Sequence, residues 1–214
     1  MDRHILSGAD SSDARASLLR KIEAVVAAGV DWIQIREKDF SGRDCALLIR
    51  KALQCAAKPS TSEANPTRIL VNDRLDVALT EGAGGVHLGE NSLPVGEAKR
   101  LADSRGRGKD FLIGVSCHTL EAAKSAASAG ADYIFFGPVF ATPSKAAYGA
   151  PQGLERLAEV CRAVSLPVLA IGGVTLENAA SCLSVGASGI AAIRLFQDAQ
   201  DVTLLVKTLR KPAA

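Results

Sequence analysis

The stretch Arg68-Ile-Leu-Val-Asn-Asp-Arg74 joins a short apolar run to a polar end, and this pattern recurs along the chain. Strands buried on both faces, as in parallel sheets, are continuous apolar runs rather than alternating ones. Six other stretches have this character: residues 31–36, 85–89, 111–116, 132–137, 167–172 and 189–194. The sequence therefore predicts seven buried strands.

Segments with helical spacing separate these strands. One apolar stripe consists of Leu18, Leu19, Ile22, Val25 and Val26. Polar side chains that can accept from the free N–H groups of a first turn predict helix starts at Ser41, Thr119 and Thr175. Glycines that permit a left-handed C-cap predict helix ends at Gly29, Gly82, Gly130 and Gly186. Such alternation implies a parallel sheet with helical crossovers.

Polar residues at the strand ends decide between a closed barrel and an open sheet. An open sheet concentrates its site at one switch point, whereas a barrel collects site residues from the carboxyl end of nearly every strand. Here polar residues follow strand after strand, at 34–38, 72–74, 116–118, 142–145 and 172–173. We therefore predict an α/β fold, a (β/α)8 TIM barrel, as one domain over residues 1–214. Because only seven strands are found, the first strand is expected to be missing or truncated at the N-terminus.

Composition and charge disfavour several classes of protein. The formal charge of +2 is nearly balanced, so neither nucleic acid nor an anionic membrane is expected as a partner. The chain has no apolar run of about 18 residues and no charged leader, which disfavours membrane spanning and secretion. Its five cysteines form no C-x-x-C pair, which indicates free thiols in the cytoplasm. The oligomeric state is left open, a homo-oligomer included.

Gln34, Arg36 and Lys38 share one face of the first predicted strand because side chains alternate along a strand. Placing two cations and an amide in a barrel mouth costs free energy unless an anion binds there. Arginine suits bidentate contact with phosphate, and lysine adds a point charge. The alternative is a set of salt bridges with Glu37, Asp39 or Asp73, which would account for part of the charge.

Three further segments are candidates for binding. Asp73, after Asn72 at a strand end, could hold a Mg²⁺ ion that carries phosphate oxygens, or could form an Asx turn or helix cap. Gly172-Gly173 before a helix could bind phosphate through backbone N–H groups, or could form a tight turn only. The loop from Thr142 to Lys145 could close over phosphate as a lid, or could be a plain surface loop. His87 and His118 each lie near a strand end, where a lone histidine is more often structural than catalytic.

Together these segments resemble the thiamine phosphate synthase family, from about Asp31 to Phe196. No single segment is decisive, but the ordered set is highly specific. The matching segments are Gln34-Ile-Arg-Glu-Lys38, Asn72-Asp-Arg74, Gly85-Val-His-Leu-Gly89, Gly114-Val-Ser116-x-His118, Gly137-Pro-Val-Phe-x-Thr142-x-Ser144-Lys145, Pro151-Gln-Gly153, Ala170-Ile-Gly-Gly173 and Gly189-Ile-Ala191. The resemblance implies a Mg²⁺-dependent transferase of thiamine biosynthesis. Such an enzyme couples 4-amino-5-hydroxymethyl-2-methylpyrimidine pyrophosphate with hydroxyethylthiazole phosphate and releases pyrophosphate.

The resemblance also implies roles for individual residues. Those implied to bind the pyrimidine pyrophosphate are Gln34, Arg36, Lys38, Asn72, Ser116 and Lys145, with Ile35 and Glu37 in the same segment as Gln34. Those implied to bind the thiazole phosphate are Thr142, Pro143, Ser144, Gly173, Ile193 and Arg194. Asp73 and Ser92 stand at the positions of the Mg²⁺ ligands, and Arg36, Lys38, Ser116, Lys145 and His118 are the implied catalytic residues. If pyrophosphate leaves first, the enzyme has to stabilise a departing polyanion and align two substrates, so no protein nucleophile is needed.

Two positions depart from the family pattern. The family has Gly-Gln-x-Asp, with the aspartate as a second Mg²⁺ ligand, where this chain has Gly89-Glu-Asn-Ser92. Serine is a weaker ligand than carboxylate and could instead cap the helix ahead of Pro94. Arg194 replaces the usual serine, and a cation there is compatible with phosphate.

The Ser92 change keeps an alternative function open. The TenI-like sister group includes a thiazole tautomerase whose proposed acid–base histidine matches His118. A tautomerase or a non-catalytic regulator of the thiamine pathway is therefore the alternative, whereas the intact Arg36, Lys38 and Asp73 favour the synthase. The cations of Gln34–Lys38, together with the loop from Thr142 to Lys145, argue against another phosphate-binding barrel enzyme, such as a sugar-phosphate epimerase.

The chain start suggests one more expectation. Family members commonly open with a strand that ends in Thr-Asp-Arg, and this chain begins Met1-Asp-Arg3. We expect the assigned start to lie inside the true gene, with the first strand lost. Reading upstream in frame tests this expectation.

Overall fold

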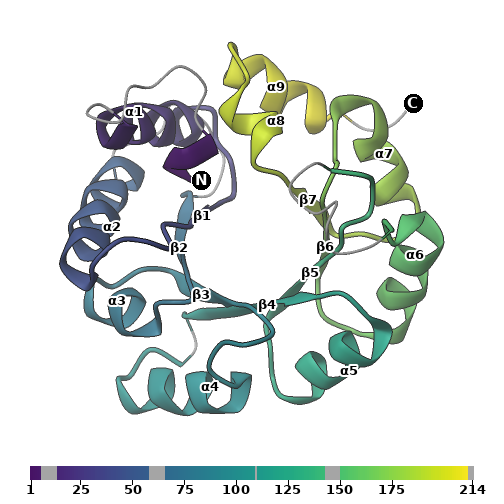
Figure 1. Ribbon diagram of the computed structural model, residues 1–214, viewed down its shortest axis with the longest axis horizontal. Helices are drawn as coiled ribbons and strands as arrows, with labels where there is room; N and C mark the ends of the chain where they lie inside the picture. The colour runs from purple at the N-terminus through teal and green to yellow at the C-terminus, as the bar shows by residue number, and fades with distance from the viewer. Residues whose placement is uncertain (6–13, 58–65, 109, 143–149, 212–214) are drawn as a thin grey trace. The chain divides into compact units, whose positions relative to one another are not determined.

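A computed structural model describes residues 1–5, 14–57, 66–108, 110–142 and 150–211. Within these ranges strands alternate with helices in a TIM-like α/β fold, which confirms the predicted class (Figure 1). The strands are β1 (Trp32–Ile35), β2 (Arg68–Asn72), β3 (Gly85–Leu88), β4 (Leu112–Cys117), β5 (Tyr133–Phe136), β6 (Val168–Ile171) and β7 (Gly189–Ala191). They form one sheet in chain order, and β1–β2, β4–β5, β5–β6 and β6–β7 pair in parallel. Each lies where an apolar run predicted it.

The helices are η1 (Arg3–Ile5, a 3-10 turn), α1 (Ala14–Ala27), α2 (Gly42–Ala56), α3 (Leu75–Thr80), α4 (Val95–Ser104), α5 (Leu120–Ser128), α6 (Gly153–Ala163), α7 (Leu176–Ser184), α8 (Arg194–Gln197) and α9 (Val202–Leu209). Three of them, α2, α5 and α7, begin directly after the caps predicted at Ser41, Thr119 and Thr175. Ser41 accepts a hydrogen bond from the Asp44 N–H at 3.1 Å, and Thr119 accepts one from the Ala122 N–H at 3.1 Å. Thr175 is the N-cap of α7. The Ser41 and Thr119 hydroxyls each satisfy an N–H group that the first helical turn leaves free.

The predicted C-terminal glycines have left-handed backbones. The φ angles are 80° at Gly29, 72° at Gly82, 89° at Gly130 and 107° at Gly186. Glycine adopts this conformation without the steric cost that a Cβ imposes, so each helix can end and turn back toward the sheet.

The chain divides into two compact units, which we describe separately. The first comprises the described residues within 1–86, 110–111 and 193–211. The second comprises 87–108 and the described residues within 112–192. The single domain that we predict over residues 1–214 stays a prediction.

The core of the first unit forms between strands and amphipathic helices. Leu18, Ile22, Val25 and Val26 of the predicted stripe on α1 are buried, whereas Leu19 is half-buried. On α2 the buried face includes Leu48 and Ile49, and β2 contributes Ile69 and Leu70. Full burial of each such side chain stabilises the fold by about 1.5–3 kcal/mol.

The first residues of the chain lie along β1 (Figure 1). The Met1 amino group donates to the Gln34 carbonyl, and the Arg36 N–H donates to the Met1 carbonyl at 2.9 Å. Gln197 of α8 binds the Asp2 backbone twice, since its Oε1 accepts from the Asp2 N–H at 3.0 Å and its Nε2 donates to the Asp2 carbonyl at 2.9 Å. In the described residues before Trp32, η1 and α1 are the only regular elements.

The cysteines carry free thiols, as predicted. Cys45, Cys55, Cys117 and Cys182 are buried, and Cys161 is half-buried. Burial raises the pKa of the Cys117 thiol to about 11. No helix of the described chain is both long and apolar enough to span a membrane.

Candidate active site

Gln34 and Asn72 meet at the carboxyl ends of β1 and β2. Gln34 Nε2 donates to Asn72 Oδ1 at 2.8 Å. The alternation of β1 places Ile33 and Ile35 on the buried side and leaves Gln34 half-buried on the other. The structure thus brings together two residues that the family resemblance implies in pyrophosphate binding.

Arg36 extends the same face but has a different partner from those expected. Its Nη1 lies 2.8 Å from the Asp2 carboxylate. Arg36 therefore forms a salt bridge, but the expected partners, Glu37, Asp39 or Asp73, were wrong. The Arg36 side chain is 36% exposed, and guanidinium has five N–H donors, so donors remain for an anion. Lys38 is exposed, and in the described part of the chain no carboxylate lies within salt-bridge distance of it.

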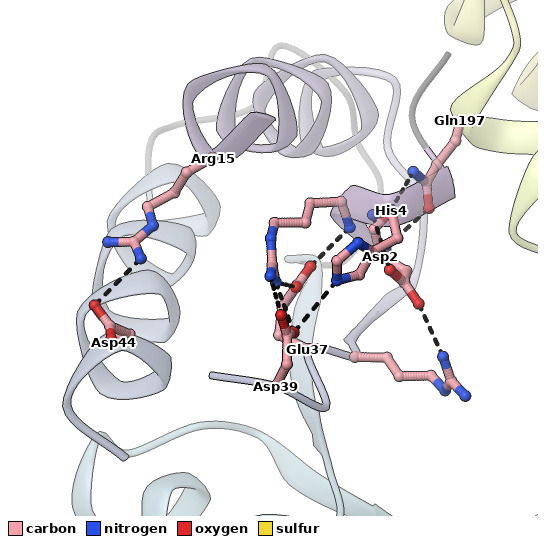
Figure 2. A network of polar contacts seen from close by, with 9 residues as sticks. Asp2, His4, Arg15, Glu37, Asp39, Asp44 and Gln197 are labelled. Carbon is pink, nitrogen blue, oxygen red and sulfur yellow. Dashed lines mark hydrogen bonds and ion pairs between the residues drawn. The ribbon is translucent and has the colours of Figure 1, made fainter. Parts of the chain in front are cut away.

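Glu37 belongs to the same network of polar contacts as Asp2, which Figure 2 shows. The Arg3 N–H donates to Glu37 Oε1 at 2.7 Å, and the Arg3 guanidinium contacts both Glu37 and Asp39. Burial raises the pKa of Glu37, whereas the hydrogen bond from Arg3 lowers the pKa of Asp39 to about 2. The side chains of Glu37 and Ile35 are buried, so these two residues can offer a substrate only backbone groups.

Asp73 occupies a strained turn directly after β2. Its φ is 65°, and among the described residues no other non-glycine residue has a positive φ. The turn is closed by backbone bonds, from the Arg74 N–H to the Asn72 carbonyl (2.7 Å) and from the Leu75 N–H to the Asp73 carbonyl (3.1 Å). Arg74 is the N-cap of α3, so the alternative interpretation of Asp73 as a helix cap is wrong. Strained backbone of this kind is enriched at functional sites.

Ser92 closes a turn of its own. Its Oγ accepts from the Gly89 N–H at 2.7 Å, and its N–H donates to the Gly89 carbonyl at 3.1 Å. The N-cap of α4 is Pro94, so the alternative role of Ser92 as a helix cap is wrong. Hydroxyl oxygens accept through two lone pairs, so this bond leaves Ser92 able to accept a second one.

The Asp73 side chain offers a carboxylate oxygen, the kind of ligand that suits a hard cation such as Mg²⁺, whereas the hydroxyl oxygen of Ser92 is a weaker ligand of the same kind. Another group could in principle hold a metal ion, since ligand atoms of Asp2, His4 and Glu37 lie within 4.8 Å of one another. Its carboxylates are already bound to Arg36 and Arg3, and those guanidinium groups disfavour a second cation (Figure 2). Asp73 therefore remains the better candidate.

In the second unit, two histidines are held by hydrogen bonds. Nδ1 of His118 contacts the carbonyl of Gly137, and this acceptor fixes the proton on Nδ1 and leaves Nε2 as an acceptor. His87 is 3% exposed and lies between Ser116 and Tyr133. The interpretation of His87 as a satisfied core residue is consistent with these contacts, and Ser116 is the implied site residue that it touches.

The loop after β5 packs on the Gly172-Gly173 turn. The Val139 N–H donates to the Ile171 carbonyl at 2.9 Å, and the Phe140 N–H donates to the Gly172 carbonyl at 3.0 Å. Gly172 and Gly173 have φ angles of 93° and 66°, and a Cβ at Gly173 would lie 2.6 Å from the Ala141 carbonyl oxygen. Both glycines are therefore needed for the turn itself, and they leave the N-terminus of α7 beside the residues that precede Thr142.

The remaining implied residues are placed as follows. Ile193 is the N-cap residue of α8 and its carbonyl accepts from the Gln197 N–H at 2.9 Å. Arg194 is exposed at the first position of α8. Pro143, Ser144 and Lys145 lie outside the described residues.

Sequence reasoning missed three contacts near the site. Asp2 as the partner of Arg36, Gln197 as the partner of Asp2, and Tyr133 as the partner of His87 all join residues far apart in the chain. The local signal for Tyr133 was present, because a phenol inside a buried strand needs a hydrogen-bond partner.

The chain is similar to known proteins over most of its length. Residues 6–196 match the family model described as thiamine monophosphate synthase. The thiamine-phosphate synthase of Methanoculleus marisnigri is 46% identical over 184 residues, which are 86% of this chain and 82% of the relative. That of Methanocella arvoryzae is 44% identical over 185 residues, with coverage of 86% and 82%.

A solved structure shows the same relationship. Thiamine phosphate pyrophosphorylase from Pyrococcus furiosus superposes with a TM-score of 0.77 and 33% identity, over 90% of this chain and 87% of that one. The chain is therefore a member of the thiamine monophosphate synthase family.

Proposed function

We propose that this chain is a thiamine-phosphate synthase. It couples 4-amino-5-hydroxymethyl-2-methylpyrimidine pyrophosphate with hydroxyethylthiazole phosphate and releases pyrophosphate. Relatives that are 46% and 44% identical to it over 184 and 185 residues carry that name. The observation that carries the proposal is the polar end of β1 and β2, where Gln34, Arg36 and Asn72 converge on one face.

Arg36 and Lys38 bind the pyrophosphate oxygens. Arginine can donate two parallel hydrogen bonds to a phosphate, and an exposed lysine adds charge without a competing carboxylate among the described residues. These contacts strengthen as negative charge collects on the leaving group, so they lower the barrier to departure. The hydrogen bond to Asn72 holds the Gln34 amide in place for the pyrimidine end of this substrate.

Asp73 is the proposed Mg²⁺ ligand, and the family resemblance implies the same role for Ser92. When bound, Mg²⁺ would neutralise part of the pyrophosphate charge. The backbone turn at Asp73 holds its carboxylate at the end of β2 without a helix cap to compete for it.

The thiazole phosphate is proposed to bind at the Gly172-Gly173 turn and the residues around Thr142. The N–H groups at the start of α7 favour an anion because they have no intrahelical partner. Pro143, Ser144, Lys145, Ile193 and Arg194 are proposed to complete this subsite. Free thiols at all five cysteines support action in the cytoplasm.

One observation favours a second function, the thiazole tautomerase. The Gly137 carbonyl holds His118 so that Nε2 can accept a proton, as an acid–base residue requires. A non-catalytic regulator would bind the same precursors without turnover.

A coupling assay tests the proposal. Purified protein is mixed with both substrates and Mg²⁺, and thiamine phosphate is measured by chromatography. We expect Mg²⁺-dependent product, and we expect Arg36→Ala to lower kcat/KM by about 100-fold because a charge-assisted phosphate contact is lost.

Lys124→Ala is the matched control, since it removes an exposed cation on α5 that has no part in the proposed site. It should leave the rate unchanged. Folded protein that gives no product would reject the synthase. Isomerisation of the thiazole phosphate carboxylate that disappears in His118→Ala would then establish the tautomerase.

A further inference from the structure

Three strands of the second unit contribute a row of polar side chains to its interior. His87 is on β3, Ser116 is on β4 and Tyr133 is on β5. The Tyr133 hydroxyl lies 3.0 Å from His87 Nδ1, and the Ser116 hydroxyl lies 2.9 Å from His87 Nε2. The Phe135 ring packs on the imidazole with centroids 4.2 Å apart. Both ring nitrogens of His87 are therefore engaged, one on each side.

The backbone makes room for this row. Gly114 lies beside Tyr133 in the β4–β5 register, and a Cβ there would come within 1.9 Å of Tyr133 Cζ. Any other residue at this position would push the phenol away from His87. Glycine is therefore required at position 114 to leave space for the Tyr133 ring, and not to form a turn.

The imidazole is neutral at physiological pH. Burial lowers the pKa of His87 to about 3 and keeps the phenol of Tyr133 protonated. A neutral imidazole has one donor nitrogen and one acceptor nitrogen, so its two neighbours cannot both donate to it.

Differences in acidity decide which neighbour donates. A phenol, with an ordinary pKa of about 10, is a stronger donor than the aliphatic hydroxyl of serine. If Tyr133 donates to Nδ1, the proton of the ring lies on Nε2 and is donated to Ser116 Oγ, and this is the arrangement that we adopt. The Ser116 proton must then point away from His87.

We propose that His87 is a positioning residue that fixes Ser116 as a hydrogen-bond donor toward an acceptor atom of the pyrimidine substrate. This inference rests on the proposed synthase function and on the role in pyrimidine binding that the family resemblance implies for Ser116. Ser116 is half-exposed, so its hydroxyl can reach both a ligand and the buried histidine. A serine whose proton direction is fixed selects acceptors, such as a pyrophosphate oxygen or a ring nitrogen, and it loses no rotational freedom when it binds one.

A double-mutant cycle tests whether His87 acts through Ser116. Ser116→Ala should lower kcat/KM for the pyrimidine substrate by about 10- to 100-fold, and His87→Leu by about 10-fold. The double variant should lose no more than Ser116→Ala alone, because His87 has nothing left to position. Losses that multiply would overturn the proposal.

Phe135→Leu is the matched control. It removes the ring that packs on His87 and leaves both hydrogen bonds in place. We expect lower thermal stability with kcat/KM little changed. A loss of kcat/KM equal to that of His87→Leu would mean that packing, and not proton direction, is what His87 supplies.

A measurement on the unmodified protein, independent of turnover, completes the test. The ¹⁵N chemical shifts of the His87 ring should show a protonated Nε2 and an unprotonated Nδ1 throughout the range from about pH 5 to pH 8. The opposite tautomer would overturn the proposal. If the wild-type protein forms no thiamine phosphate, the proposed function is rejected instead. The tautomer seen by NMR would still decide the proton arrangement at Ser116.

Discussion

Asp73 has a backbone conformation that residues with a Cβ avoid. A φ of 65° costs a residue other than glycine about 1–2 kcal/mol, and asparagine and aspartate tolerate it best. Among the described residues, the only non-glycine residue with such a backbone is the one that we propose as a Mg²⁺ ligand. Substitutions here can therefore separate the effect of the backbone from that of the carboxylate.

Asp73→Asn keeps the tolerated backbone and removes the charge. We expect the free energy of unfolding to change by less than about 0.5 kcal/mol, while the Mg²⁺ concentration for half-maximal activity rises at least about tenfold. Asp73→Ala should in addition lose about 1 kcal/mol in urea unfolding. An unchanged Mg²⁺ titration in Asp73→Asn would remove Asp73 from the ligand set.

His87 gives the stability of the protein a pH dependence of known sign. The pKa of His87 is about 3 in the folded chain, and an unfolded histidine has a pKa of about 6.5. Between these values the unfolded chain binds a proton that the folded chain does not, so acidification through this window destabilises the fold, by up to about 1.4 kcal/mol per pH unit. In His87→Gln, the free energy of unfolding should fall less steeply below about pH 6.5. Parallel curves for the two proteins would show that His87 already binds its proton in the folded state.

At the scale of elements, the loop after β5 and the turn after β6 hold one another. Backbone hydrogen bonds from Val139 and Phe140 join the loop to the turn, and the glycines leave no space for a side chain. The geometry of the proposed thiazole phosphate subsite therefore depends on two segments that are about 30 residues apart in the chain.

Two glycines with similar backbones allow that dependence to be measured. Gly173 (φ 66°) would place a Cβ 2.6 Å from the Ala141 oxygen, whereas Gly153 (φ 76°) has nothing within 4 Å of that position. Gly153→Ala should cost about 1 kcal/mol in strain alone, and Gly173→Ala should cost about 1–3 kcal/mol more and raise the KM for thiazole phosphate. Equal losses of stability with an unchanged KM would show that the loop does not depend on Gly173.

The sequence predicted the elements because their signals are local. The apolar run of β2 and the glycine at 82 each act within a few residues, and the structure has the strand and the left-handed turn where they were expected. The partner of Arg36 was not predictable in this way, because Asp2 lies 34 positions away and any nearby carboxylate satisfied the pattern. The bond of Ser92 to Gly89 was missed for another reason, since a serine before a helix also matches a cap.

At the scale of the molecule, one side chain joins residues near the two ends of the chain. Gln197 is buried and binds both the N–H and the carbonyl of Asp2, which stands 195 positions earlier. Asp2 in turn binds Arg36, so a residue of α8 supports a proposed pyrophosphate contact through the first unit (Figure 2).

Gln197→Met removes these two bonds at nearly constant volume. We expect the free energy of unfolding to fall by about 1–3 kcal/mol, because two buried backbone groups lose their partner, and the KM for the pyrimidine substrate to rise. Lys207→Met on the exposed side of α9 is the control and should change neither quantity. Urea unfolding and the coupling assay measure both, and a Gln197→Met protein as stable as the control would mean that other groups satisfy Asp2.

The buried thiols have a practical consequence for fluorescence labelling. A cysteine introduced at Leu204, which is 61% exposed on α9, would have an ordinary pKa of about 8.5. Burial raises the pKa of Cys117 to about 11, so the reactive thiolate fraction of Cys117 at neutral pH is much smaller. A maleimide dye should therefore distinguish position 204 from Cys117 by reaction rate alone, with that native cysteine left in place.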